Sequence, residues 1–200
     1  MARTAEQNAA MREATREAIE DAAVRVFATR GFAASKIRHI AAESGLSAGS
    51  IYRHYASKEA LFDALLNTAS RGVQAAAQTL SSDAEPLTLV RGFTRILLTD
   101  LASGGSEAAF YLVLNHAFLT DTPRGSAARL AGSQRALWDA FAALIARGQA
   151  FGQFVDGDPH RLTAYYFAML SGTASMRTLI PDGITEQDVD LVLRLLTEMR

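Results

Sequence analysis

Three consecutive side chains that could do chemistry, Tyr52, Arg53 and His54, lie where the helical spacing predicts an exposed face. Tyrosine and histidine can hydrogen-bond to phosphate oxygens, and arginine can reach either a phosphate or the edge of a base. The small residues just before them, at positions 48–50, would let the backbone approach base edges closely. This combination of residue types indicates contact with duplex nucleic acid rather than catalysis.

Polar and cationic residues on both sides extend this surface. The chain has only two lysines, Lys36 and Lys58, and both fall in this stretch. Lys58 follows Ser57, the expected cap of a helix, so an ammonium and a positive helix N-terminus would lie together in an arrangement suited to phosphate. The predicted DNA-contacting residues are Ser35, Lys36, Arg38, Ser47, Ala48, Gly49, Ser50, Tyr52, Arg53, His54 and Lys58.

The segment that must position these residues reads as two short helices joined by a turn. Ser35 is a candidate N-cap, and apolar residues follow it at helical spacing. Gly45 can take the left-handed conformation that ends a helix, and Ser47 is the next candidate cap. Ile51 and Tyr55 are four residues apart and should face inward. This pattern is typical of a helix-turn-helix, whose second helix can enter a major groove.

Residues 19–66 resemble the DNA-binding domain of the TetR (tetracycline-repressor) family of transcriptional regulators. The resemblance lies in the stretches AAVRVFATRGF, S-x-I-x-x-IA and SGLSAGSIYRHYASKEALF. Lys36 departs from the pattern, because the family has threonine or another small residue there. Beyond residue 66 only length and helical pattern agree. The resemblance implies a dimeric, ligand-responsive regulator, most commonly a repressor that binds a palindromic operator and is released by a small-molecule effector.

The whole chain reads as helices, with no strand-like alternation and no internal repeat. We expect an all-α protein with an N-terminal three-helix helix-turn-helix domain and a C-terminal helical domain for ligand binding and dimerisation. The predicted DNA-binding domain covers residues 1–56, and the regulatory domain covers residues 57–200. A helix near 57–80 should bridge them. Residues 1–11 should be frayed and solvated, or alternatively form an arm that touches a minor groove.

Two helices near the end of the chain have more than one face suited to packing. The helix expected at 158–178 has a bulky face and a face of small residues, and the helix expected at 185–199 is apolar on more than one side. A helix needs two apolar faces only when each face packs against a different neighbour. We therefore predict a homodimer in which residues 158–178 and 185–199 pair with their copies.

The segment 107–119 is apolar all round except for Asn115 and His116. These two residues are either satisfied by neighbouring polar groups or orient a ligand in an apolar cavity. No cluster of arginine or lysine lies in the helices concerned, so we expect a largely apolar, neutral or cationic effector. The candidate effector-binding residues, which could also simply fill a core, are Phe110, Tyr111, Leu114, Asn115, His116, Phe118, Trp138, Phe141, Tyr165 and Met169.

Other chemistries find little support in the sequence. Residues 45–49, GLSAG, match the G-x-S-x-G nucleophile elbow, but that motif needs a strand before it and a helical segment precedes it here. The four histidines lack metal-ligand spacing and the chain has no cysteine, so we expect no metal, no cofactor and no enzyme. No apolar run is long enough for a bilayer and no signal segment is visible, which predicts a cytoplasmic protein.

The net charge of −1 is divided unevenly, with +3 over residues 1–58 and −4 over residues 59–200. The excess of positive charge lies at the helix-turn-helix end, as expected of a DNA-binding head. Two alternatives stay open. The helical part could be an enzyme or carrier domain that the head localises to DNA, or the protein could be an architectural DNA binder without an effector.

Overall fold

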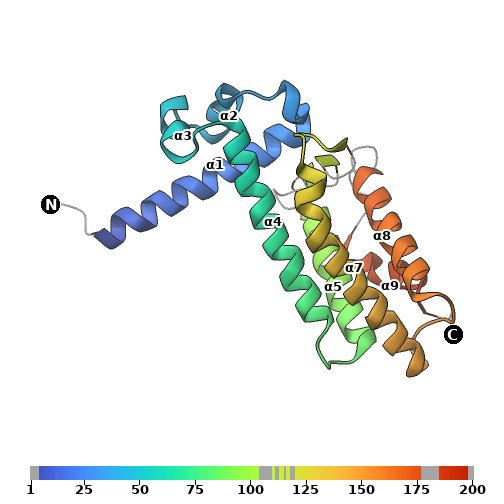
Figure 1. Ribbon diagram of the computed structural model, residues 1–200. Coiled ribbons are helices and arrows are strands. Elements are labelled where there is room, and N and C mark those ends of the chain that lie inside the picture. The colour runs from blue at the N-terminus through green and yellow to red at the C-terminus, as the bar shows by residue number, and fades with distance from the viewer. Residues whose placement is uncertain are drawn as a thin grey trace. The chain divides into compact units, whose positions relative to one another are not determined.

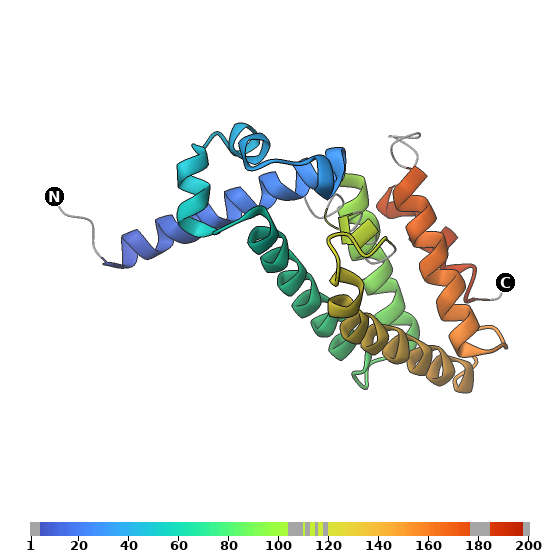
Figure 2. The same ribbon diagram turned by 45° about the horizontal axis from the view of Figure 1, so that its top comes forward.

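A computed structural model describes residues 5–103, 110, 113–114, 116–117, 120–176 and 185–197. All regular secondary structure in these residues is helical, which confirms the predicted all-α class (Figures 1 and 2). The chain divides into two compact units, one formed by Met1–Thr68 with Ala109–Ala127 and the other by Ala69–Ala108 with Ala128–Arg200. None of the described helices combines the length and apolarity needed to cross a membrane.

The first unit is built on α1, which runs from Ala5 to Ala34. Residues 6–14 are exposed and, in both ribbon views, lead away from α2 and α3. The described start of the chain is therefore helical rather than frayed. Gly31 breaks the helical path with φ 71° and ψ 161°, which glycine adopts most readily.

The helix-turn-helix consists of α2 (Ile37–Ser44) and α3 (Ala48–His54). Gly45 ends α2 with φ 68° and ψ 16°, the left-handed conformation expected from the sequence. The fourth helix, α4 (Lys58–Leu80), begins in this unit. Apolar side chains at helical spacing form the core: Ile19, Ala22, Ala23, Val26 and Phe27 of α1, Ile37, Ile40 and Ala41 of α2, Ile51 and Tyr55 around α3, and Leu61, Phe62, Leu65 and Leu66 of α4.

The second unit contains the rest of α4, α5 (Pro86–Ser103), most of α7 (Ser126–Ala150), α8 (Pro159–Met176), the 3-10 helix η1 (Glu186–Asp188) and α9 (Val189–Leu193). Asp158 caps α8, because its Oδ1 accepts from the His160 N–H at 2.8 Å. The helix predicted at 185–199 is shorter in the structure. It opens as η1 behind a capping box formed by Thr185 and Asp188 and gives way to turns after Leu193.

Aromatic rings join α5, α7 and α8, which lie side by side in both ribbon views. Phe141 of α7 stacks on Tyr166 of α8 with ring centroids 4.5 Å apart. Both rings are fully buried, and the Tyr166 hydroxyl lies 2.7 Å from Thr94 Oγ1 on α5. The polar end of this buried tyrosine is therefore satisfied inside the core, as burial requires.

A glycine lets the end of α7 accept a neighbouring ring at very close range. A Cβ atom added to Gly148 would lie 2.1 Å from Cδ2 of Phe154, a distance that real Cβ atoms do not tolerate. Phe154 is itself buried, in the segment that follows α7. Gly132, on the same helix, has open space around it. One glycine of α7 is thus required by packing, whereas the other is not.

We expect Gly148→Ala to destabilise the protein by about 1–3 kcal/mol, because the added methyl overpacks the core. Gly132→Ala is the matched control and should raise the free energy of unfolding by about 0.5–1 kcal/mol, because alanine favours a helix interior. Chemical denaturation followed by circular dichroism measures both. Equal effects of the two substitutions would contradict the packing of Phe154 against Gly148.

Candidate DNA-contacting surface

The helix α3 has only seven residues, too few to be stable by itself in water. Its first turn is capped by Ser47, whose Oγ accepts from the Ser50 N–H at 3.1 Å. Ile51 is fully buried, and burying such a side chain contributes about 1.5–3 kcal/mol. The packing of one face therefore holds the helix, and the opposite face is left free for a partner.

Tyr55 holds the C-terminal end of α3 against α1. The side chain is buried, and its hydroxyl donates to the carboxylate of Glu20. Burial raises the pKa of Tyr55 well above its usual value, and the hydrogen bond to Glu20 and that residue's charge raise it further. The phenol is thus protonated at any physiological pH and serves as a permanent donor. The sequence predicted the inward face of Tyr55 but gave no sign of Glu20, 35 residues earlier.

The outer face of α3 carries the predicted polar side chains. Tyr52 is 55% exposed, which is unusual for a tyrosine with nothing to contact. Arg53 is exposed as well, and its Nη2 donates to Ser50 Oγ at 2.7 Å. Ser50 Oγ also accepts from Ser47 Oγ at 3.2 Å, so both donors converge on one oxygen. Gly49 is exposed and His54 is half-buried beside them.

The N-terminus of α2 differs from the sequence prediction at Ser35. This residue was expected to cap α2 and to contact DNA, but it is only 2% exposed and its Oγ donates to Gly31 O at 2.7 Å. The N-cap is Lys36 instead, which has no side-chain oxygen to accept a hydrogen bond. A buried hydroxyl that already has a partner is not available to a phosphate, so the Ser35 prediction is corrected.

Lys36 and Arg38 are exposed at the start of α2, as a DNA contact requires. The Lys36 N–H donates to Nδ1 of His39 at 3.3 Å, which supplies the missing cap. Partial burial lowers the pKa of His39 below its usual value, and the charges of Arg30, Arg38 and Lys36 lower it further. A lowered pKa favours the neutral imidazole, which is the form that can accept this hydrogen bond.

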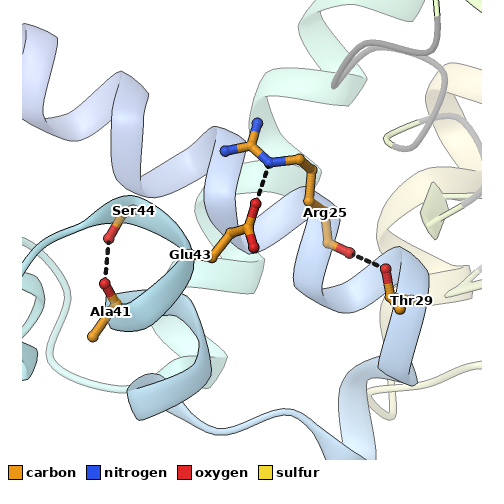
Figure 3. Close-up of polar contacts among 5 residues, drawn as sticks. All are labelled: Arg25, Thr29, Ala41, Glu43 and Ser44. Carbon is orange, nitrogen blue, oxygen red and sulfur yellow. Dashed lines mark hydrogen bonds and ion pairs between the residues drawn. The ribbon is translucent and has the colours of Figure 1, made fainter.

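An ion pair and two local hydrogen bonds accompany the packing of α2 on α1 (Figure 3). Arg25 Nε donates to Glu43 Oε1 at 2.7 Å, and both side chains are almost half exposed. Such an exposed pair contributes only about 0–1 kcal/mol. Thr29 Oγ1 donates to Arg25 O at 2.8 Å, and Ser44 Oγ donates to Ala41 O at 3.3 Å. Burial of the apolar core therefore outweighs these polar contacts.

Lys58, for which a phosphate contact is predicted, also makes contacts within the first unit. The side chain is half-buried, and its Nζ donates to Phe32 O at 2.7 Å and to Ser35 O at 3.0 Å. The same ammonium lies 4.1 Å from the centroid of the Phe32 ring. Two of the three N–H groups of the Lys58 ammonium therefore already donate hydrogen bonds within the first unit.

The candidate effector-binding residues fall in both compact units. In the first unit, Phe110 and Leu114 are half-buried and His116 is exposed. In the second unit, Phe141 is buried, Met169 is half-buried and Trp138 and Tyr165 are 42% and 59% exposed. The three remaining candidates lie outside the described residues: Tyr111, Asn115 and Phe118.

One neighbour of these rings was not among the candidates. Phe167 of α8 stacks on Trp138 with centroids 5.8 Å apart and planes 8° from parallel, and it also contacts Phe93 and Phe141. Tyr165, one of the candidates, is largely exposed, whereas its neighbour Tyr166 is fully buried. Only the apolarity of Phe167 could have indicated its role from the sequence.

Comparisons with known proteins agree with the helix-turn-helix geometry. A model of the tetR family of bacterial regulatory proteins matches residues 19–65. The uncharacterized HTH-type transcriptional regulator YerO of Bacillus subtilis is 50% identical over 46 residues, which are 23% of this chain. This match spans only 16% of the length of YerO.

Solved structures share the fold over nearly the whole chain. AibR in complex with isovaleryl coenzyme A and operator DNA has a TM-score of 0.70 at 20% identity, covering 90% of this chain and 96% of AibR. A transcriptional regulator from Saccharomonospora viridis in complex with choline has a TM-score of 0.67 at 21% identity, covering 94% of this chain and 100% of that one. Residues 19–65 thus match the tetR family of bacterial regulatory proteins in sequence, and the chain as a whole shares the fold of these solved structures.

Proposed function

We propose that the chain is a homodimeric repressor that binds a palindromic operator through α3 and is released by a small-molecule effector. The observation that supports DNA binding most is the contrast between the two faces of α3. Ile51 is fully buried, whereas its neighbour Tyr52 is 55% exposed. A short helix held by one face and polar on the other can present its outer side chains to a major groove.

The outer side chains divide into two roles in this proposal. Arg53 and Ser50 read base edges, because their linked hydrogen-bonding groups lie on the outer face of α3. Tyr52, His54, Lys36 and Arg38 contact phosphates, and the backbone at Ala48 and Gly49 permits close approach. Residues 1–56 would then be the DNA-binding domain and residues 57–200 the regulatory domain, joined by α4, which runs unbroken from Lys58 to Leu80.

Substitutions on α3 should separate these roles. We expect Tyr52→Phe to weaken binding to all duplexes alike, by about fivefold for one lost hydrogen bond. Arg53→Gln should instead change the preferred base at one operator position. Fluorescence anisotropy with an operator selected from random DNA, and a repeat selection with Arg53→Gln, measure the two effects. Arg135→Gln on α7, which removes an exposed arginine, is the control. If it weakened DNA binding as much as the substitutions on α3, the proposed surface would be contradicted.

The dimer proposal rests on one exposed face of α8. Tyr165 is 59% exposed, and the exposed residues that follow at helical spacing are small: Ala168, Gly172 and Ser175. Leu191 of α9 is 60% exposed as well. Small side chains let another helix approach closely, and the buried face of α8, with Tyr166 and Leu170, already packs in the core. A second copy is the partner that a palindromic operator requires.

We expect wild-type protein to sediment as a dimer of 21.5 kDa chains and Ala168→Glu to sediment as a monomer, because the interface would bury an unpaired carboxylate. Truncation after Pro181 should have the same effect, since it removes α9. Ala143→Glu, at an exposed position of α7, is the matched control and should leave the dimer intact. A monomeric wild type, or a dimeric Ala168→Glu, would refute this interface.

The effector proposal rests on the aromatic rings of the second unit. Trp138 stacks on Phe167 while 42% of its own surface is exposed, so a bound molecule could reach its ring. We propose a largely apolar, neutral or cationic effector in contact with these rings. The fold itself does not select the effector's charge, because related folds hold the cation choline and the anionic isovaleryl coenzyme A.

Trp138 is the only tryptophan, so its fluorescence should report occupancy directly. We expect a hydrophobic cation such as tetraphenylphosphonium to change the emission saturably and, over the same concentrations, to lower operator affinity. Phe167→Ala should weaken the response, and Phe151→Ala, which removes an exposed ring just after α7, should not. An emission change without any change in operator affinity would argue that the rings are not the effector site.

A further inference from the structure

Arg53 lies near the end of α3, as the sixth of its seven residues. In a helix-turn-helix, base edges are contacted mainly by residues toward the start of the second helix. An arginine so far along the helix can also reach the phosphates that border the groove. Residue type and sequence position therefore leave both roles open, and the direction of the side chain decides between them.

Ser50 draws the Arg53 side chain back along the helix. Arg53 Nη2 donates to Ser50 Oγ at 2.7 Å, and Ser50 lies three residues nearer the start of α3. Helical side chains already lean toward the N-terminus, so the hydrogen bond continues a direction that the backbone favours. The guanidinium is thereby held beside the first turn of α3, which contains the small residues Ala48 and Gly49.

The Ser50 hydroxyl has no acceptor capacity left for a ligand. A serine hydroxyl has one donor hydrogen and two acceptor lone pairs. Ser50 Oγ accepts from Arg53 Nη2 at 2.7 Å and from Ser47 Oγ at 3.2 Å, which uses both lone pairs. A guanidinium has five N–H donors and no acceptor. The linked pair of Ser50 and Arg53 therefore offers only donors to whatever approaches it.

Donors alone match one base edge better than the others. In the major groove guanine presents two acceptors, O6 and N7, whereas adenine presents one acceptor and one donor. Cytosine presents a donor, and thymine presents one acceptor and a methyl group. Only guanine gives this donor pair two acceptors, and the amino group of adenine or cytosine would face another donor without a partner.

We propose that Arg53 reads one guanine in each half of the operator, and that Ser50 is the positioning residue that directs Arg53 to it. The inference rests on the DNA binding proposed above and adds which base is read. The Ser50 hydroxyl is itself held in place, because Ser47 donates to it and accepts from the Ser50 N–H at 3.1 Å. An arginine that is ordered before DNA arrives loses less conformational freedom on binding.

Base analogues test which atoms are read. We expect selection from random DNA to yield a duplex with one invariant guanine in each half-site. Replacing both guanines with 7-deazaguanine, which lacks the N7 acceptor, should weaken binding about tenfold or more. Inosine keeps O6 and N7 and lacks only the minor-groove amino group, so it is the matched control and should bind as guanine does. Fluorescence anisotropy measures the three affinities.

Variants assign the reading to Arg53 and the positioning to Ser50. Arg53→Ala should bind the guanine and 7-deazaguanine duplexes alike, because the group that contacts N7 is gone. Ser50→Ala keeps the arginine without its partner, so the penalty for 7-deazaguanine should fall to about threefold. Ser50→Thr keeps the hydroxyl and should retain the full penalty. Arg53→Gln should prefer adenine at the same position, because an amide offers both a donor and an acceptor.

A selected operator without an invariant guanine would overturn the proposal, as would an equal 7-deazaguanine penalty in the wild type and in Arg53→Ala. A phosphate role for Arg53 would appear as a salt slope of log K lowered by about 0.9 per subunit in Arg53→Ala, with the penalty retained. A full penalty in Ser50→Ala would refute the positioning role of Ser50. If the wild type binds no duplex, the DNA-binding proposal itself fails, whereas binding without a guanine overturns only the reading by Arg53.

Discussion

The burial of one face of α3 is the constraint on which the proposed DNA-contacting surface depends. Seven residues cannot hold a helix in water, so Ile51 and Tyr55 must anchor it to the first unit. The burial of Ile51 contributes about 1.5–3 kcal/mol, and a hydrogen bond to a charged partner such as Glu20 contributes about as much. The left-handed turn at Gly45 lets the chain return to this site directly after α2. Tyr52 and Arg53 are exposed because Ile51 and Tyr55, on the opposite face of the helix, are held in the core.

A second set of contacts holds the other end of α2. The junction after Gly31 is closed by Ser35, whose backbone and hydroxyl both bond to residues just before it. Phe27, Phe32 and Phe62 pack together beneath it, with ring centroids 4.9–5.6 Å apart. Two sets of buried contacts, one at each end of the helix-turn-helix, therefore hold its two helices in place. Their strength comes from burial, since the exposed Arg25–Glu43 pair contributes little.

Local patterns predicted most of the fold. Four-residue spacing identified the inward face of α3, and Ser47, Asp158 and Thr185 act as the caps that their residue types indicated. Long-range partners could not be predicted, because nothing in a local pattern ties Tyr55 to Glu20. The prediction that Ser35 caps α2 was wrong for a related reason. A serine before a helix suggests a cap, but its position one residue early and the turn at Gly31 direct its hydroxyl into the core.

Lys58 shows most clearly where sequence reasoning stops. A lysine at a helix N-terminus suits a phosphate, and nothing in the local sequence indicated that its ammonium also donates to Phe32 O and Ser35 O. The second unit raises the same difficulty. Tyr165 and Tyr166 are adjacent and alike in type, yet one is largely exposed and the other fully buried. The face of α8 that meets the core is set by Phe141 and Thr94 on neighbouring helices.

The central claim is that α3 and the start of α2 form the DNA-contacting surface. Hydrogen–deuterium exchange, measured by mass spectrometry with and without a duplex selected from random DNA, tests it most directly. The account predicts slower exchange at residues 36–39 and 47–54 when duplex is bound. Unchanged exchange at 47–54, with slower exchange confined to the second unit, would contradict it.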